Sequence, residues 1–350
     1  MNKRIKLAWN TLNMISPTSH MSHCKATAPA KVILFGEHFV VYGSPAILAA
    51  INKNISVDAR TTIHDEDKIV IRSDIGVAGE YWHDGEFFNA LEGGKKAKAV
   101  LDPLYRAIRQ VLLKRNKKNI GIEADISSKV PPGIGLGSSA ASCVATVAAV
   151  YSLFQKNPSR QKVCELAIES ERLIHKRTSG ADCYVSTFGG LMRYYSKSKR
   201  FKNIETKGSL SLVVANTGIK HSTSDLVAGV KRFKDTNKIL FESLAKQASD
   251  ICLQACTAIE SGKYEKVGEL MNENQLLLQQ IGISHHKVHD IIDICRKAGA
   301  MGAKITGAGG GGAVIALAAS KQESNKIASH VKAAGYHSFE VKIDYDGLSF

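Results

Sequence analysis

The feature that most constrains this chain is a glycine-rich run at residues 131–142, which reads PPGIGLGSSAAS. Glycines at alternate positions let the backbone turn sharply and approach a bulky ligand closely. The small and apolar residues at 140–154 predict a buried helix, and its first turn would present unpaired N–H groups and the positive end of the helix dipole. Because such a turn binds phosphate, and serine hydroxyls at 138 and 139 can bond phosphate oxygens or ligate magnesium, the run predicts a nucleotide-phosphate loop.

Two other nucleotide motifs fit the run less well. A dinucleotide-binding fold places G-x-G-x-x-A directly after a strand, with an acid about 20 residues further on. Gly135, Gly137 and Ala140 match that pattern, but two prolines interrupt the strand exit and no acid occurs at 140–154. A Walker loop needs Gly-Lys followed by Ser or Thr, which the sequence lacks. A tight structural turn with packing glycines stays open, although two prolines, three glycines and two serines together disfavour it.

Composition excludes several function classes. The chain has 350 residues, enough for two domains, and a formal net charge of +15. Its basic residues are dispersed and follow no zinc-finger or RNA-recognition pattern, so we expect no nucleic-acid partner. No apolar run reaches membrane-spanning length, so we expect no membrane partner. Cys252 and Cys256 are four residues apart and would share a helix face, while the other five cysteines show no metal-ligand spacing. We therefore expect reduced thiols in a cytoplasmic protein.

Strand and helix patterns mix in both halves, which predicts the α+β class with two domains. Residues 1–22 contain no acid and differ in character from the body of the chain, so we expect a disordered or spurious leader there. We expect the domain with the phosphate loop at 23–205 and a second domain at 206–350, with the polar, basic segment 196–207 as their junction. Residues 224–282 predict several helices, with breaks near 236 and 262.

Phosphoryl transfer needs a phosphate cradle, a metal ion, a base and positive charge near the reacting oxygens. Asp182 is the candidate base, although an acid after Ser-Gly is often only a helix cap. Lys31 lies within the apolar stretch APAKVI, where it must reach solvent or be held by a partner, and it is the candidate cation. Ser139 and Glu171 are candidate magnesium ligands; without a metal, Glu171 would be a surface acid.

A second glycine cluster occupies residues 307–312 and precedes a strand rather than a helix. Consecutive glycines cost conformational entropy, which suggests a loop that another group approaches closely. A flexible hairpin is the plainer interpretation.

Three segments together, in this order and spacing, resemble the GHMP kinases: residues 28–43 (APAKVILFGEHFVVYG), 131–142 and 304–312 (KITGAGGGG). The resemblance implies a ribosomal-protein-S5-domain-2-like N-terminal domain and a ferredoxin-like C-terminal domain, with the site between them. The segment Val40-Val41-Tyr42-Gly43 after Gly36-Glu37-His38 is most similar to family members that phosphorylate mevalonate. The implied activity is therefore ATP-dependent phosphorylation of the 5-hydroxyl of (R)-mevalonate in isoprenoid biosynthesis. The alternative is a member that acts on phosphomevalonate or another small alcohol.

The resemblance also implies residue roles. Asp182 and Lys31 match catalytic positions, and Ser139 and Glu171 match ligands of Mg²⁺. The ATP-binding positions are Ser128, Gly133, Ile134, Gly135, Leu136, Gly137, Ser138 and Ser139. The mevalonate-binding positions are Lys31, Glu37, His38, Asp182 and Thr223. Asp74 falls where the family has an adenine-side asparagine, and a cytoplasmic homodimer is implied as well.

Overall fold

The computed structural model describes the chain apart from residues 1–21, 63–67, 118–119, 132, 175–177 and 220–221. The leader expected at 1–22 lies outside the described residues, except for residue 22. None of the helices within the described part is long and apolar enough to cross a membrane.

The first half of the chain builds an eight-stranded sheet. Its strands are β1 (His23–Phe35), β2 (Pro45–Thr62), β3 (Lys68–Ser73), β4 (Val77–Trp82), β5 (Phe87–Glu92), β6 (Gly121–Ser128), β7 (Leu191–Tyr195) and β8 (Arg200–Ile204). Their order is β5-β4-β3-β6-β2-β7-β8, and β1 pairs with β2. The first part of β2 pairs with β7 and its last part pairs with β6. This long strand therefore joins the β7–β8 part of the sheet to the part that contains β3 to β6. All pairings are antiparallel except that between β3 and β6.

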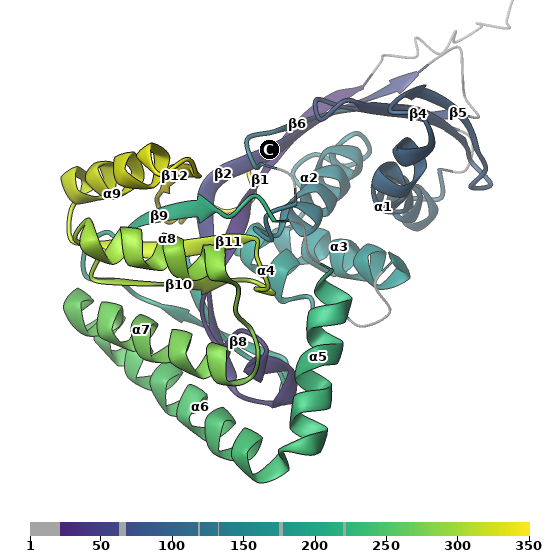
Figure 1. Cartoon of the computed structure of the whole chain (residues 1–350). Helices are drawn as coiled ribbons and strands as arrows, with labels where there is room; N and C mark the ends of the chain where they lie inside the picture. Colours follow the sequence, from purple (N-terminus) through teal and green to yellow (C-terminus); the bar gives the residue numbers. More distant parts are fainter. Residues whose placement is uncertain (1–21, 63–67, 118–119, 132, 175–177, 220–221) are drawn as a thin grey trace, which may run out of the picture.

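Four helices accompany this sheet, on one side of it (Figure 1). They are α1 (Lys95–Lys114), α2 (Ser138–Ser152), α3 (Arg160–Ile174) and α4 (Ala181–Phe188). Helix α2 contacts β1, β2 and the other three helices, and 11 of its 15 residues are buried. A helix that is apolar on every side belongs inside a protein, so α2 is the central helix of this half.

The second half builds a four-stranded antiparallel sheet with the order β10-β11-β9-β12. These strands are β9 (Ser211–Asn216), β10 (Gly302–Thr306), β11 (Ala313–Ala318) and β12 (His337–Val341). The helices of this half are α5 (Thr223–Thr236), α6 (Lys238–Glu260), α7 (Tyr264–Gln280), α8 (His286–Lys297) and α9 (Lys321–Ala333). Both halves combine strands and helices, which confirms the expected α+β class.

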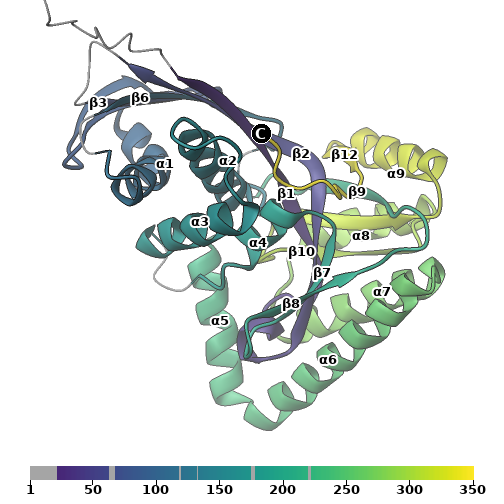
Figure 2. The same ribbon diagram turned by 180° about the vertical axis from the view of Figure 1, so that it is seen from behind.

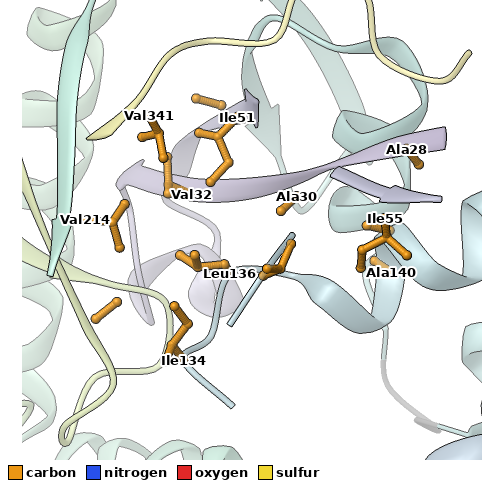
Figure 3. Close-up of a cluster of buried hydrophobic side chains, with 14 of the residues drawn as sticks. Ala28, Ala30, Val32, Ile51, Ile55, Ile134, Leu136, Ala140, Val214 and Val341 are labelled. Carbon is orange, nitrogen blue, oxygen red and sulfur yellow. The ribbon is translucent and has the colours of Figure 1, made fainter. Parts of the chain in front are cut away.

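The two sheets share one hydrophobic core. Figure 3 shows Ile134 and Leu136 beside Val32 of β1 and Val214 of β9. The end of the chain also returns to the first sheet, where Ser349 bridges to Thr27 (Figure 2). Residues that lie between the two sheets are therefore supported by packed side chains from both of them.

Several elements differ from the sequence expectations. Two strands were expected at 46–51 and 55–61, but both ranges belong to the single strand β2. The polar residues between them lie at an irregularity in the pairing of β2 with β1, which does not interrupt the strand. The expected junction at 196–207 contains β8, which forms a hairpin with β7. The expected boundary at 205/206 falls between β8 and β9, and the domain limits themselves stay a prediction.

Candidate active site

A cavity of about 510 Å³ lies where segments far apart in the sequence meet. Strand β1, the turn after it, the loop before α2, the start of α4, the start of α5 and the second glycine cluster all contribute to its lining. Its lining includes the predicted residues Lys31, Glu37, His38, Gly135, Gly137, Ser138, Ser139, Asp182 and Thr223, together with Gly307 and Ala308. The structure thus brings together most of the residues that the sequence singled out.

The loop before α2 alternates between two environments. Gly133, Gly135 and Gly137 all have positive φ angles, of 77°, 80° and 71°, which a residue with a side chain seldom adopts. Between them, Ile134 and Leu136 are buried, at 3% and 1% exposure, in the core that the two sheets share (Figure 3). The Leu136 carbonyl also accepts a hydrogen bond of 2.9 Å from the Lys31 N–H. The core therefore anchors the loop through its large residues, while its glycines leave the backbone open to a ligand.

Helix α2 begins at Ser138, directly after this loop, with Gly137 as its N-cap. Glycine has no side chain to cap the helix, so within the described residues the N-cap position provides no side-chain acceptor to the N–H groups of the first turn. These N–H groups and the helix dipole form a favourable environment for phosphate. Ser138 and Ser139 border both the main cavity and a second one of about 200 Å³, which Ser128 also lines.

Lys31 and Asp182 form an ion pair at the main cavity. The Lys31 ammonium nitrogen lies 3.3 Å from the Asp182 carboxylate, and the two side chains are 5% and 39% exposed. Asp182 is the second residue of α4, while Lys31 comes from the middle of β1. A β-carbon added to Gly137 would lie 2.8 Å from the Lys31 side chain, so the phosphate loop passes directly over this lysine. A cation is thus held between a carboxylate and a phosphate-binding loop.

Ser128 lines the second cavity, and its backbone is hydrogen-bonded to Asp74. The Asp74 carboxylate accepts a hydrogen bond of 2.8 Å from the Ser128 N–H, and the Ser128 hydroxyl donates to the Val130 carbonyl over 3.1 Å. Asp74 therefore fixes the segment that leads from β6 into the phosphate loop.

Glu171 and Ser139 offer oxygen ligands of two kinds. Glu171 is 6% exposed, and its carboxylate accepts a hydrogen bond of 3.0 Å from the Thr178 hydroxyl. Within the described part of the chain there is no group of three or more His, Cys, Asp or Glu suited to a metal ion. Magnesium in nucleotide sites takes one or two protein oxygens and fills the rest with phosphate and water, so two oxygen donors are enough in kind. Ser139 lines both cavities, whereas Glu171 is not among the described residues that line either of them, and their joint role as magnesium ligands stays a prediction.

Glu37 and His38 lie at the turn between β1 and η1 (Phe39–Tyr42), opposite the second glycine cluster. His38 donates a hydrogen bond of 2.7 Å from Nε2 to the Ala308 carbonyl. Burial lowers the pKa of His38, and this hydrogen bond opposes the shift. The Glu37 carboxylate does not reach into open space but forms an ion pair with Lys304 of β10. Burial raises the pKa of Glu37 and lowers that of Lys304, and each partner opposes the shift of the other.

Lys304 was not among the residues expected at the site. Its signal was present, because Lys304 stands in the apolar stretch AKIT just as Lys31 stands in APAKVI. Residues 303–306, expected as part of a loop, form most of strand β10. A lysine inside a buried strand requires a partner, and the partner lies 267 residues away in the sequence.

Comparison with known proteins matches both halves of the chain. The family model of the GHMP kinases N terminal domain matches residues 102–190, and that of the GHMP kinases C terminal matches residues 255–337. Mevalonate kinase of Pyrococcus furiosus is 40% identical over 333 residues, which cover 92% of this chain and 97% of that protein. Mevalonate kinase of Aeropyrum pernix is 35% identical over 297 residues, covering 84% and 88%.

Solved structures give the same result. The crystal structure of L. major mevalonate kinase in complex with R-mevalonate has a TM-score of 0.79 and 30% sequence identity, covering 92% of this chain and 97% of that one. The structure of the Methanococcus jannaschii enzyme has a TM-score of 0.78 and 27% identity, covering 92% and 99%. The fold, the phosphate loop and these matches show that the chain belongs to the GHMP kinases, which confirms the resemblance and the two-domain fold that it implied. Within that family it belongs with the mevalonate kinases, enzymes that take ATP as co-substrate.

Proposed function

We propose that this enzyme transfers the γ-phosphoryl group of ATP to the 5-hydroxyl of (R)-mevalonate, giving 5-phosphomevalonate and ADP. The observation that carries the proposal is the Lys31–Asp182 ion pair at the cavity, beside the phosphate loop. The relative bound to R-mevalonate supports the choice of acceptor.

Asp182 takes the proton of the primary hydroxyl as that oxygen attacks phosphorus. Its partly exposed carboxylate borders the cavity, and general-base help of this kind contributes about 10²–10⁴-fold to a rate. The Lys31 ammonium, almost fully buried, favours the deprotonated hydroxyl and neutralises charge that develops on the transferring group.

The loop at 133–139 and the first turn of α2 bind the phosphates through backbone N–H groups. Ile134 and Leu136 contribute through their backbone, since their side chains are buried. Ser128 lies on the nucleoside side, at the second cavity. Ser139 and Glu171 would hold Mg²⁺, which supplies charge neutralisation on the phosphates when bound. His38 and Thr223 border the acceptor side, and Glu37 lies behind them.

The test is release of ADP by the purified enzyme, coupled to a reporter enzyme, with magnesium-ATP and either mevalonate or 5-phosphomevalonate. We expect turnover with mevalonate alone, and a reaction without acceptor serves as the control for ATP hydrolysis. Turnover with 5-phosphomevalonate alone would overturn the acceptor and the roles of His38 and Thr223, but would leave the ATP site intact. The homodimer and the cytoplasmic location implied by the resemblance stay predictions.

A further inference from the structure

Glu37 and Lys304 form an ion pair that is completely buried between the two halves of the molecule. Both side chains have an exposure of 0%. The Lys304 ammonium donates to the Glu37 carboxylate and, over 2.6 Å, to the Ile305 carbonyl. The second carboxylate oxygen of Glu37 lies 3.4 Å from the side-chain nitrogen of Asn274 on α7. The pair thus joins the turn after β1 to β10 and α7.

Stability alone does not explain this pair. Taking two charges out of water is costly, and replacing a buried ion pair by well-packed apolar residues is often neutral or stabilising. Removing only one partner is strongly destabilising, because it leaves an unpaired charge in the interior. A buried ion pair can instead fix one arrangement of the segments that carry its two partners. The contacts next to the pair show which segments these are.

The neighbouring contacts repeat the same connection along two short segments. One residue beyond Glu37, His38 bonds the Ala308 carbonyl at 2.7 Å. Two residues beyond Lys304, the Thr306 hydroxyl bonds both the N–H and the carbonyl of Ile33, at 2.9 and 3.0 Å. Residues 33–38 and 304–308 therefore contact each other at three places, of which the ion pair is one.

Two features connect this contact to the lining of the cavity. His38 has φ 58° and ψ −48°, a backbone conformation that costs energy in a residue with a side chain and persists only when its surroundings impose it. Gly307 faces the phosphate loop, because a β-carbon added there would lie 3.1 Å from the Gly135 carbonyl. A small displacement of β10 would therefore move both His38 and the glycine cluster where they line the cavity.

We propose that Glu37 and Lys304 are positioning residues, which hold the His38 turn and the loop at 307–308 at the separation that the acceptor requires. In this role Glu37 acts through Lys304 and does not itself bind the acceptor. The inference rests on the proposed function, because mevalonate is the acceptor in the assay.

The test is a double-mutant cycle in the full chain, with Glu37→Met, Lys304→Met and the double variant. We expect each single variant to raise the KM for mevalonate about tenfold or more, since small misplacements of binding groups have large kinetic effects, and to change the KM for ATP less. We expect the double variant to be no worse than the poorer single variant, because once Lys304 is absent Glu37 has nothing left to position. Glu37→Gln, which keeps the shape and hydrogen-bonding capacity of the side chain, should recover part of the loss.

Ser338→Ala is the matched control. It removes a buried hydrogen bond of 2.8 Å to the Ala328 carbonyl, away from the cavity, and should lower stability without changing either KM. If Glu37→Met raised the KM for mevalonate by the same factor with and without Lys304, Glu37 would bind the acceptor directly and the proposal would be wrong. Wild-type KM values in both single variants would also overturn it.

If a single variant does not fold, the double variant is compared with Thr306→Val, which removes the contact with Ile33 but leaves Glu37 in place. A raised KM for mevalonate in both variants supports positioning. A wild-type KM in Thr306→Val beside a raised KM in the double variant would mean that Glu37 binds the acceptor directly, and wild-type values in both would also overturn the proposal. These outcomes concern the variants alone. An inactive wild-type enzyme would instead overturn the proposed function.

Discussion

At the scale of single residues, the Lys31–Asp182 pair combines unequal environments. The lysine side chain is 5% exposed and the aspartate side chain 39%. The aspartate is thus open to a substrate hydroxyl, while the lysine is fixed beneath it by β1 and by the phosphate loop. Such an arrangement suits a base that must be reached and a cation that must not move.

Asp182→Asn tests the base. The amide cannot accept the proton, so we expect kcat to fall by about 10²–10⁴-fold. The unfolding midpoint should fall as well, because the almost buried Lys31 loses its charged partner. Glu323→Gln in the first turn of α9 is a matched control, because it also removes a helix N-terminal acid but lies away from the cavity. Steady-state kinetics and thermal unfolding of both variants provide the measurement. A rate near that of the wild type for Asp182→Asn would exclude Asp182 as the base.

Lys31→Met tests the cation. The apolar replacement keeps the side chain's length and removes its charge, so kcat should fall about 10²-fold while the KM for ATP changes little. Kinetics with each substrate varied in turn distinguish the two effects. An unchanged kcat would refute the role proposed for Lys31.

At the scale of elements, the phosphate loop depends on glycine at one position for two reasons. Gly137 has φ +71°, and an added β-carbon would lie 2.8 Å from the Lys31 side chain. Gly335, after α9, has φ +85° but open space around it. Both positions therefore require a left-handed backbone, but only at Gly137 would a β-carbon also collide with a neighbouring side chain.

We expect Gly137→Ala and Gly335→Ala to lose similar stability, about 1–2 kcal/mol each, from the left-handed backbone. Only Gly137→Ala should also lower kcat, by about tenfold, because it displaces Lys31 from Asp182. Denaturant unfolding and kinetics of the two variants check this. Equal kinetic effects would mean that the loop's contact with Lys31 does not matter for turnover.

Local sequence patterns predicted most of these elements. The apolar segment at 140–154 gave α2 to within two residues at each end, and the helices of 224–282 end near the predicted breaks. Strands β4 and β5 were not predicted. Most residues of β5 are exposed and lack the alternation that marks a half-buried strand. Strand β4 is mostly buried, but its sequence VAGEYW contains glycine and glutamate, which are depleted in strands. The lysine at 304 could not be given a role, because its partner Glu37 is adjacent only in the folded chain.

At the scale of the whole molecule, six of the seven cysteines are buried. Burial raises the pKa of Cys164 from 9.0 to about 11 and that of Cys295 from 9.0 to about 12. Between about pH 9 and pH 11 these two thiols stay protonated in the folded chain, whereas the same thiols lose their protons in the unfolded chain. Their contribution to stability is complete below about pH 9 and is lost as the pH rises through the folded-state values.

The free energy of unfolding should therefore decline between about pH 9 and pH 11. Urea unfolding at several pH values measures it, and Cys295→Ala should show a shallower decline than the wild type over the same interval. A pH dependence identical in the two proteins would show that the thiol of Cys295 takes no part.

The alternation within the phosphate loop separates residues that stabilise the fold from residues that leave room for the ligand. The side chains of Ile134 and Leu136 lie in the core that both sheets share, whereas their glycine neighbours meet the cavity or solvent. Leu136→Ala should thus cost about 2–5 kcal/mol of folding free energy, as any core truncation would. Across five consecutive positions, 133–137, substitutions at the even-numbered residues should affect mainly stability. Substitutions at the odd-numbered glycines should lower turnover by more than their backbone cost of about 1–2 kcal/mol in stability explains. A mutational scan scored for both abundance and turnover would then find that the turnover of each folded molecule falls mainly at the odd-numbered positions.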